Sequence, residues 1–190
     1  MTEGKNNKQK NDTPKKLVWM DLEMTGLDSD RDVIIEMATL ITDTELNIIA
    51  EGPEIVIQRH QELFETMDSW NREHHTKSGL WAKVVSSNIT QNEAEQTTID
   101  FLKQHMGPKE SPLCGNSIWQ DRRFIAKHMK ELDAFLHYRL LDVSSVKIIG
   151  KMWYPKEFEK NSEKKSSHRA LDDIKESIEE LKSYRQLIFK

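Results

Sequence analysis

Two acidic residues stand one position apart in the short apolar segment Leu17 to Glu23, which is typical of a buried strand. Alternate side chains of a strand project to the same side, so Asp21 and Glu23 share one face and the apolar residues beside them share the other. Neighbouring carboxylates repel each other and need a compensating cation. Their hard oxygen ligands suit Mg²⁺ or Mn²⁺, so the pair predicts a divalent metal site. The alternative is a chance acidic pair at the end of a strand.

A third carboxylate, Asp121, lies in a segment with helical periodicity over residues 119–132. At the helical period it shares a face with the apolar residues Phe124 and Ile125, and with His128. An unpaired carboxylate on the inward side of a helix is destabilising, which indicates a partner such as a metal ion. The alternative is a helix-start residue close to an N-cap.

The third acidic element is the segment His168 to Asp173, at the start of a helix predicted from about residue 169 to residue 189. Asp172 falls nearly opposite the apolar stripe of that helix and is expected to be solvated. Asp173 falls at the border of the stripe, so it can reach a site at the edge of the core. His168 precedes the helix, where a loop can aim it at the same site; an ordinary surface histidine is the alternative.

The elements that must position these residues follow from the hydrophobic patterns. Strands are predicted over residues 17–23, 33–42, 46–58, 112–116 and 139–143. Helical patterns cover residues 61–106, 119–132, 144–152 and 169–189. Residues 155–167 are predicted to be a charged loop. Three strands with short connections favour an antiparallel meander, and the later alternation of strands with helices implies an α/β domain with a mixed sheet.

The composition limits the possible partners. The 190 residues carry a net charge of −4, whereas proteins that track long nucleic acid usually have a basic stripe. A nucleic-acid substrate would therefore present few phosphates, and no long nucleic acid is expected as a stable partner. No apolar run approaches the ~20 residues that span a membrane, so no membrane partner is expected. Residues 1–15 are polar and are expected to be a disordered leader.

Cysteine usage favours the cytosol. The single cysteine, Cys114, allows neither an intrachain disulfide nor a cysteine metal cluster. The first residues also lack the hydrophobic segment of a signal peptide. The simplest setting is therefore cytoplasmic.

Taken together, the acidic residues resemble the motifs of the DEDDh exonuclease superfamily, which has a ribonuclease H-like fold. Asp21 and Glu23 match its first motif, Asp121 its second, and His168 with Asp173 its third. Within that superfamily, four segments look like the oligoribonuclease family: residues 19–27, 114–118, 120–124 and 167–174. The resemblance implies a single exonuclease domain over residues 16–190, with a mixed five-stranded sheet flanked by helices. Trp119 departs from the family, where a smaller residue is expected, and would alter the rim of the site.

The resemblance implies a hydrolase: a metal-dependent 3′-to-5′ exoribonuclease that degrades very short RNA to nucleoside 5′-monophosphates. Its substrates would be RNAs of two to five nucleotides, dinucleotides above all. Two divalent cations, Mg²⁺ or Mn²⁺, would be held by Asp21, Glu23, Asp121 and Asp173. His168 would be the general base, since an unperturbed histidine titrates near ~6.5.

The resemblance also implies the substrate contacts and a homodimer. Leu27 would wedge against one base, and Trp70 would stack on the other, a contact worth about 1–3 kcal/mol. The terminal 5′ phosphate would be capped by Ser117, Arg139 and Ser144, with Tyr138 and His75 nearby. The partner subunit would contribute part of this cap. The alternatives are a half-buried structural aromatic for Trp70 and a salt bridge at a strand start for Arg139.

Three competing functions remain open at this point. A related DEDDh nuclease could trim or proofread longer RNA or DNA 3′ ends, but it would need a more basic surface. A non-catalytic binding module could keep the fold without turnover, although all five catalytic positions are filled. A structural metal protein would use the carboxylates and leave His168 without a role.

Overall fold

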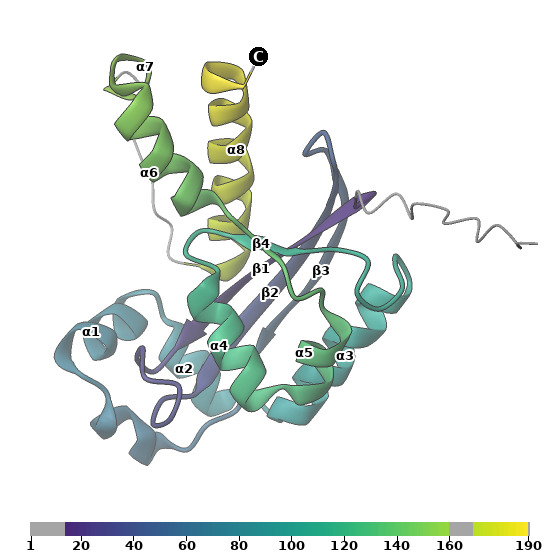
Figure 1. Cartoon of the computed structure of the whole chain (residues 1–190). Helices are drawn as coiled ribbons and strands as arrows, with labels where there is room; N and C mark the ends of the chain where they lie inside the picture. Colours follow the sequence, from purple (N-terminus) through teal and green to yellow (C-terminus); the bar gives the residue numbers. More distant parts are fainter. Residues whose placement is uncertain (1–13, 160–168, 190) are drawn as a thin grey trace, which may run out of the picture.

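A computed structural model of the chain describes residues 14–159 and 169–189. At its centre is a five-stranded sheet in the order β3-β2-β1-β4-β5 (Figure 1). The strands are β1 (Lys16–Met24), β2 (Ile34–Asp43), β3 (Ile48–Val56), β4 (Leu113–Gly115) and β5 (Leu140–Asp142). The first three are antiparallel neighbours, whereas β4 pairs with β1 and β5 pairs with β4 in parallel. The predicted mixed α/β sheet with an antiparallel meander is confirmed.

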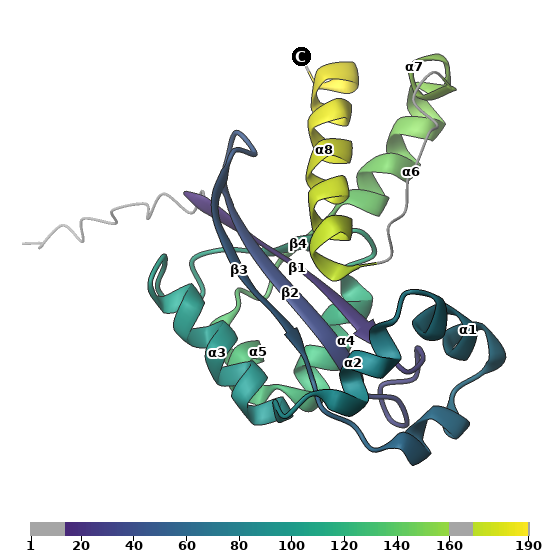
Figure 2. The same cartoon turned by 180° about the vertical axis from the view of Figure 1, so that it is seen from behind.

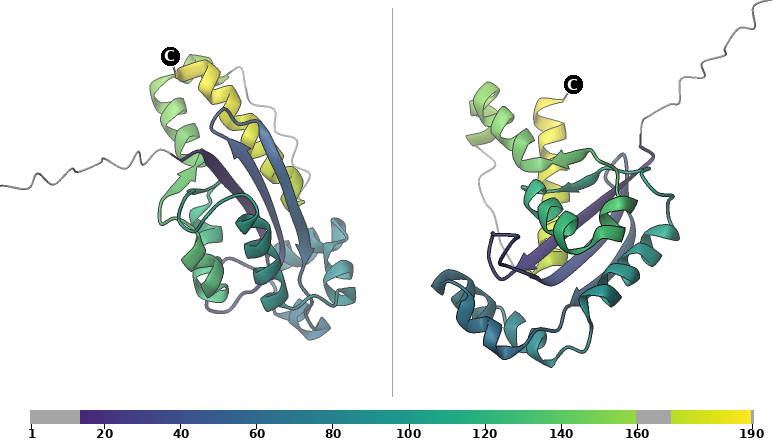
Figure 3. Two further views of the ribbon diagram at one scale, coloured as in Figure 1. Left: turned by 90° about the vertical axis from the view of Figure 1, so that its right-hand side faces the viewer. Right: turned by 60° about the horizontal axis from the view of Figure 1, so that its bottom comes forward.

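The alternation of side chains along β1 divides the core into two halves. Val18, Met20 and Leu22 belong to one apolar cluster, and Leu17 and Trp19 belong to another. Helices of the first half are α3 (Gln91–Lys103), α4 (Trp119–His128) and α5 (Lys130–Phe135). Helices of the second half are α6 (Val143–Trp153) and α8 (Ala170–Ile188). Figures 2 and 3 show α8 on one face of the sheet and α3 to α5 on the other. Asp21 and Glu23 therefore point toward the face that α8 covers.

The predicted helical stretch over residues 61–106 is divided by local signals that fix helix ends. It contains η1 (Gln61–Thr66), α1 (Ser69–Lys77), α2 (Leu80–Ser86) and α3. The side chain of Asp68 caps α1 by accepting a hydrogen bond from the Asn71 N–H at 2.8 Å. Gly79 separates α1 from α2 in the left-handed region, at φ +71°. Thr90 and Glu93 form a capping box at the start of α3.

Two other predicted boundaries are wrong. The helix predicted over residues 119–132 is interrupted at Met129, whose φ of −133° and ψ of 73° are not helical, so α4 and α5 are separate. The loop predicted over residues 155–167 begins with the short helix α7 (Pro155–Glu159), for which proline is a favourable first residue. Residues 160–167, and residues 1–13 of the predicted leader, lie outside the described residues.

Strand β4 approaches β1 closely and buries the cysteine. A Cβ atom at Gly115 would lie 3.0 Å from the carbonyl oxygen of Met20 and 2.9 Å from Ile118 Cδ1, so glycine permits this approach. Cys114 is 0% exposed, and burial raises the pKa of its thiol far above the usual range.

Among the helices described, none is both long and apolar enough to span a membrane.

Candidate active site

Carboxylates from strand β1 and helix α8 come together on one face of the sheet. Asp21 and Glu23 lie near the end of β1, and Asp173 lies in the first turn of α8. One oxygen of each carboxylate lies within 4.8 Å of the oxygens of the other two. Asp173 is half-buried and Asp172 is exposed, as the phase of the predicted helix requires.

Asp121 reaches this region from helix α4. Its side chain is 6% exposed, and its Oδ1 accepts a hydrogen bond from the backbone N–H of Leu22 at 2.9 Å. The charge of Asp121 is the strongest of the neighbouring charges that raise the pKa of Asp21. The structure therefore gathers the four carboxylates expected from the sequence, while His168 lies outside the described residues.

The electrostatics of the site favour added positive charge. Burial, followed by the charges of Glu36 and Asp173, raises the pKa of Glu23 to about 8. Burial raises the pKa of Asp121 to about 7. Burial and the charge of Asp121 also raise the pKa of Asp21 well above its usual value. Buried carboxylates in this state hold protons unless a cation replaces them, and hard oxygen donors fit divalent ions such as Mg²⁺ and Mn²⁺.

A buried ion pair next to the cluster was not anticipated from the sequence. Glu36 of β2 is 0% exposed and lies directly opposite Glu23 in the β1–β2 register. Like charges in this position are destabilising. Arg169, just before α8, compensates: it donates to Glu36 at 3.0 Å and also pairs with Glu54. The signal that could have revealed the pair is a glutamate inside the apolar run of residues 33–42.

Of the residues expected to cap a phosphate, the two serines meet at the turn after β4, whereas Tyr138 and Arg139 lie beside the start of β4, because Leu140 pairs with Leu113. The backbone N–H of Ser117 lies 2.9 Å from Asp142 Oδ1 and 3.0 Å from Ser144 Oγ. The two serine hydroxyls are 3.1 Å apart. Arg139 and Tyr138 immediately precede β5, with the guanidinium 5.3 Å from the centre of the Tyr138 ring. Asp142 was missed at the sequence level, and it fixes both serines by accepting their backbone N–H groups.

The residues expected to contact bases are exposed. Leu27 is 68% exposed in the turn after β1, and its carbonyl accepts a hydrogen bond from Gln120 Nε2 at 2.8 Å. Trp70 is 65% exposed on α1 and stacks on His74, with ring centres 4.8 Å apart. His75, which was expected near the phosphate cap, is buried on α1 beside Glu23, and burial lowers the pKa of its imidazole.

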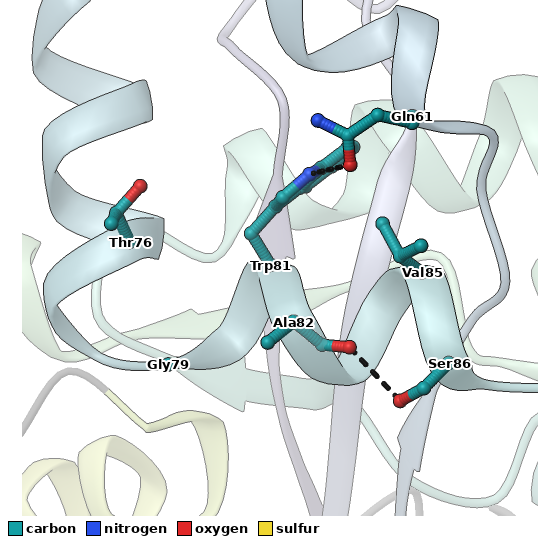
Figure 4. Close-up of a pocket in the computed structure, with 7 residues that line it drawn as sticks. All are labelled: Gln61, Thr76, Gly79, Trp81, Ala82, Val85 and Ser86. Carbon is teal, nitrogen blue, oxygen red and sulfur yellow. Dashed lines mark hydrogen bonds between the residues drawn. The ribbon is translucent and has the colours of Figure 1, made fainter.

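Two pockets lie near these elements. A pocket of about 560 Å³ includes Leu27 and Arg123 in its lining, and so adjoins the expected base contact. Arg123 also lies 5.4 Å from the ring centre of Trp119, which is half-exposed at the start of α4. A second pocket of about 410 Å³ lies between η1 and α2 (Figure 4). Its lining contains none of the expected site residues, and Trp81 donates to Gln61 across it at 3.0 Å.

Comparison with known proteins identifies the family. The model of a family described as Exonuclease matches residues 18–181. The oligoribonuclease of Marinobacter nauticus is 54% identical over 175 residues, which cover 92% of this chain and 97% of that protein. The human protein named "Oligoribonuclease, mitochondrial" is 51% identical over 175 residues, which cover 92% of this chain and 74% of that protein. The chain belongs to the oligoribonuclease family of exonucleases.

As a member of the oligoribonuclease family, the protein is a hydrolase. It is a 3′-to-5′ exoribonuclease that depends on divalent metal ions. Solved structures of exonuclease I confirm the predicted ribonuclease H-like fold. The enzyme from Methylocaldum szegediense superposes with a TM-score of 0.64 at 15% identity, over 92% of this chain. Another exonuclease I structure gives a TM-score of 0.67 at 13% identity. The chain spans 41% of the length of both of these proteins.

Proposed function

We propose that this exoribonuclease hydrolyses RNAs of two to five nucleotides, dinucleotides above all, to nucleoside 5′-monophosphates. The observation that carries the proposal is the cap of Ser117 and Ser144 beside the start of α4, the helix that bears Asp121. Ser117 lies two residues before α4, and Asp121 is the third residue of that helix, so the cap adjoins the carboxylate along the chain. A 5′ phosphate held at this cap leaves little room for further nucleotides before the carboxylates.

Asp21, Glu23, Asp121 and Asp173 would hold two divalent cations, Mg²⁺ or Mn²⁺. Bound cations would supply charge neutralisation on the phosphate and on the leaving oxygen. The raised pKa values of Glu23 and Asp121 support this role, because the cluster is unfavourable without added positive charge.

His168 would accept the proton of the attacking water. Arg169, the next residue, pairs with buried Glu36, and Asp173 of the carboxylate cluster follows His168 by five residues. This closeness along the chain supports the role, because a general base must lie within hydrogen-bond reach of the proton that it removes.

The exposed side chains of Leu27 and Trp70 would contact the two bases of a dinucleotide. Stacking on Trp70 would contribute about 1–3 kcal/mol. His74 already stacks on the Trp70 ring with nearly parallel planes, 6° apart, and so orients it. Tyr138 and Arg139, whose side chains lie together before β5, would complete the phosphate cap in part across the dimer, and His75 would support the end of β1 at Met24.

A single-turnover length series tests the proposal. RNAs of two, three, five and twenty nucleotides, with and without a 5′ phosphate, are compared in Mg²⁺ and in EDTA. We expect the 5′-phosphorylated dinucleotide to be cleaved fastest, and Arg139→Ala to remove the advantage of the phosphate. Arg185→Ala is the matched control, because Arg185 is an exposed arginine that pairs with Glu45. Equal cleavage of the shortest and longest RNAs would instead favour an enzyme that trims longer 3′ ends.

We further propose that the enzyme is a homodimer. Helix α6 carries exposed apolar side chains at helical spacing, Ile148 59%, Ile149 41%, Met152 69% and Trp153 68%. Such a stripe is unfavourable in water, and a second copy of the chain would cover it. Tyr138, 74% exposed, lies outside α6 and could reach the partner's site.

We propose that the enzyme acts in the cytosol. The proposal rests on the single cysteine, which is typical of a reducing compartment. The mouse relative is named "Oligoribonuclease, mitochondrial", so cell fractionation must distinguish the two compartments.

A further inference from the structure

Two adjacent histidines of helix α1 lie beside Glu23. One ligand atom of His74, one of His75 and one carboxylate oxygen of Glu23 all lie within 4.8 Å of one another. The two imidazole rings meet edge to face, with centres 5.5 Å apart and planes at 76°. Helix α1 lies at the end of the sheet where β1 ends (Figure 1), which brings these side chains together from two elements.

One ring nitrogen of His75 contacts the backbone and the other is left without a partner. Its side chain is 1% exposed, and its Nε2 lies 2.9 Å from the carbonyl oxygen of Met24. A carbonyl can only accept, so Nε2 carries the hydrogen and Nδ1 carries the lone pair. That Nδ1 is buried and has no hydrogen-bond partner. Metal-binding histidines commonly donate one ring N–H to a backbone carbonyl and bind the ion through the other nitrogen.

We propose that Glu23, His74 and His75 form a binding site for Zn²⁺. Two imidazoles and a carboxylate are typical zinc ligands, and three protein ligands leave a fourth position open. Mg²⁺ prefers oxygen ligands alone, whereas affinity for imidazole rises along the first transition row toward copper and zinc. The two histidines therefore make this site selective against Mg²⁺, although Glu23 belongs also to the carboxylate cluster.

Sharing Glu23 gives the site a regulatory consequence. A carboxylate that binds Zn²⁺ together with His74 and His75 is drawn away from Asp21 and Asp173. Zn²⁺ should therefore inhibit hydrolysis that is supported by Mg²⁺. This consequence rests on the proposed function, but the binding of Zn²⁺ does not.

Zinc affinity is measured on the full chain after treatment with EDTA, by competition with a chromogenic chelator in excess Mg²⁺. We expect one Zn²⁺ per chain that Mg²⁺ does not displace. His74→Asn and His75→Asn should each raise the Kd for Zn²⁺ at least about 10–100-fold, the range seen when even supporting contacts of metal sites are lost. His60→Asn is the matched control, because His60 is an exposed histidine beside η1 and should leave the Kd unchanged.

Equal Zn²⁺ affinity in the wild type and in His74→Asn would overturn the proposal, as would displacement of Zn²⁺ by Mg²⁺. His75 is buried and its replacement could unfold the chain, so thermal melting accompanies each titration. His74 is only half-buried, so the His74→Asn variant still tests the zinc site if His75→Asn does not fold.

Hydrolysis is then followed during a Zn²⁺ titration, with each variant compared with its own rate in Mg²⁺ alone. We expect His74→Asn to need at least about tenfold more Zn²⁺ for half-inhibition, in line with its loss of affinity. If short RNA is not cleaved in Mg²⁺ but Zn²⁺ binding still depends on the histidines, the proposed function fails and the zinc site stands. If cleavage occurs and the histidine substitutions leave Zn²⁺ affinity unchanged, the zinc site fails and the proposed function stands.

Discussion

The carboxylate of Asp121 accepts a hydrogen bond from the backbone N–H of Leu22 at 2.9 Å, which joins helix α4 to the strand that carries Asp21 and Glu23. The same side chain is therefore a structural link and a candidate metal ligand. Loss of the acceptor would leave a buried N–H without a partner, at a cost of about 1–3 kcal/mol. Loss of the charge would remove a metal ligand and would also lessen the repulsion among the carboxylates.

Asp121→Asn and Asp121→Ala separate these two roles. Asparagine keeps an acceptor oxygen and removes a repelling charge, so we expect the free energy of unfolding in EDTA to be no lower than that of the wild type. Alanine should lower it by about 1–3 kcal/mol. Both variants should lose Mg²⁺-dependent hydrolysis, because neither supplies a negative charge. Urea denaturation and dinucleotide cleavage are the measurements, and substantial cleavage by Asp121→Asn would contradict the metal assignment.

The raised pKa values predict that the metal-free protein loses stability as the pH rises. A carboxyl group with a raised pKa in the folded state binds more protons there than in the unfolded chain, so its contribution is complete only below the unfolded value. For Glu23 the loss should extend from the ordinary pKa of 4.5 to about 8. In EDTA, the Tm should therefore fall across this range.

Added Mg²⁺ should restore the Tm, and more so at high pH, because the cation replaces the protons. Glu23→Gln should flatten the dependence on pH. Glu179→Gln, which changes an exposed glutamate on α8, is the control and should leave the slope intact. A Tm that is independent of pH in EDTA would show that repulsion among the carboxylates does not destabilise the metal-free protein.

Arg169 should stabilise the fold mainly because it compensates the charge of buried Glu36. Arg169→Met leaves that carboxylate without its partner and should destabilise the fold by about 3–5 kcal/mol. Adding Glu36→Gln should recover part of the loss, and a double-mutant cycle in urea measures the coupling. Lys175→Met, which removes an exposed pair with Glu51, should cost less than about 1 kcal/mol. Additive effects of the two buried substitutions would contradict the pairing.

His168→Gln should lower kcat by about 10²–10⁴-fold, the usual contribution of a general base. Mg²⁺ affinity should not change, because the four carboxylates are intact. Single-turnover cleavage and isothermal titration with Mg²⁺ give the two quantities, and His60→Gln serves as the control. An unaltered kcat would remove His168 from the mechanism.

A charge on the exposed stripe of α6 should separate the proposed dimer. Trp153→Glu should convert it to a monomer in sedimentation experiments, because it would bury an unpaired charge in an interface that must bury about 800 Å² of surface per partner. Ile89→Glu places the same charge at a residue 39% exposed outside α6 and should leave the dimer intact. A wild-type chain that sediments as a monomer at every concentration would contradict the homodimer.

Much of the candidate site could be predicted because local periodicity determines which side chains share a face. The alternation of β1 put Asp21 and Glu23 on one side, and the helical phase buried Asp121 while exposing Asp172. Such relationships need only the residues within one element. The order of the first three strands followed from their short connections.

Relationships between elements could not be predicted in the same way. Glu36 lies opposite Glu23 only in one register of the β1–β2 pair, and hydrophobic patterns leave that register open. The bond from Ser117 to Asp142 joins the turn after β4 to the end of β5, 25 residues later, through a serine at φ +50°. The break at Met129 carries no glycine or proline signal, so a continuous helix was the natural prediction.

The burial of Cys114 in strand β4 has a practical consequence. A thiol that is 0% exposed, with a pKa raised by burial, does not react readily with maleimide dyes. Because it is the chain's single cysteine, a cysteine introduced at an exposed position would be the sole site of fluorescent labelling. Distances within the enzyme, and between two copies, could then be followed by energy transfer without first removing a native thiol.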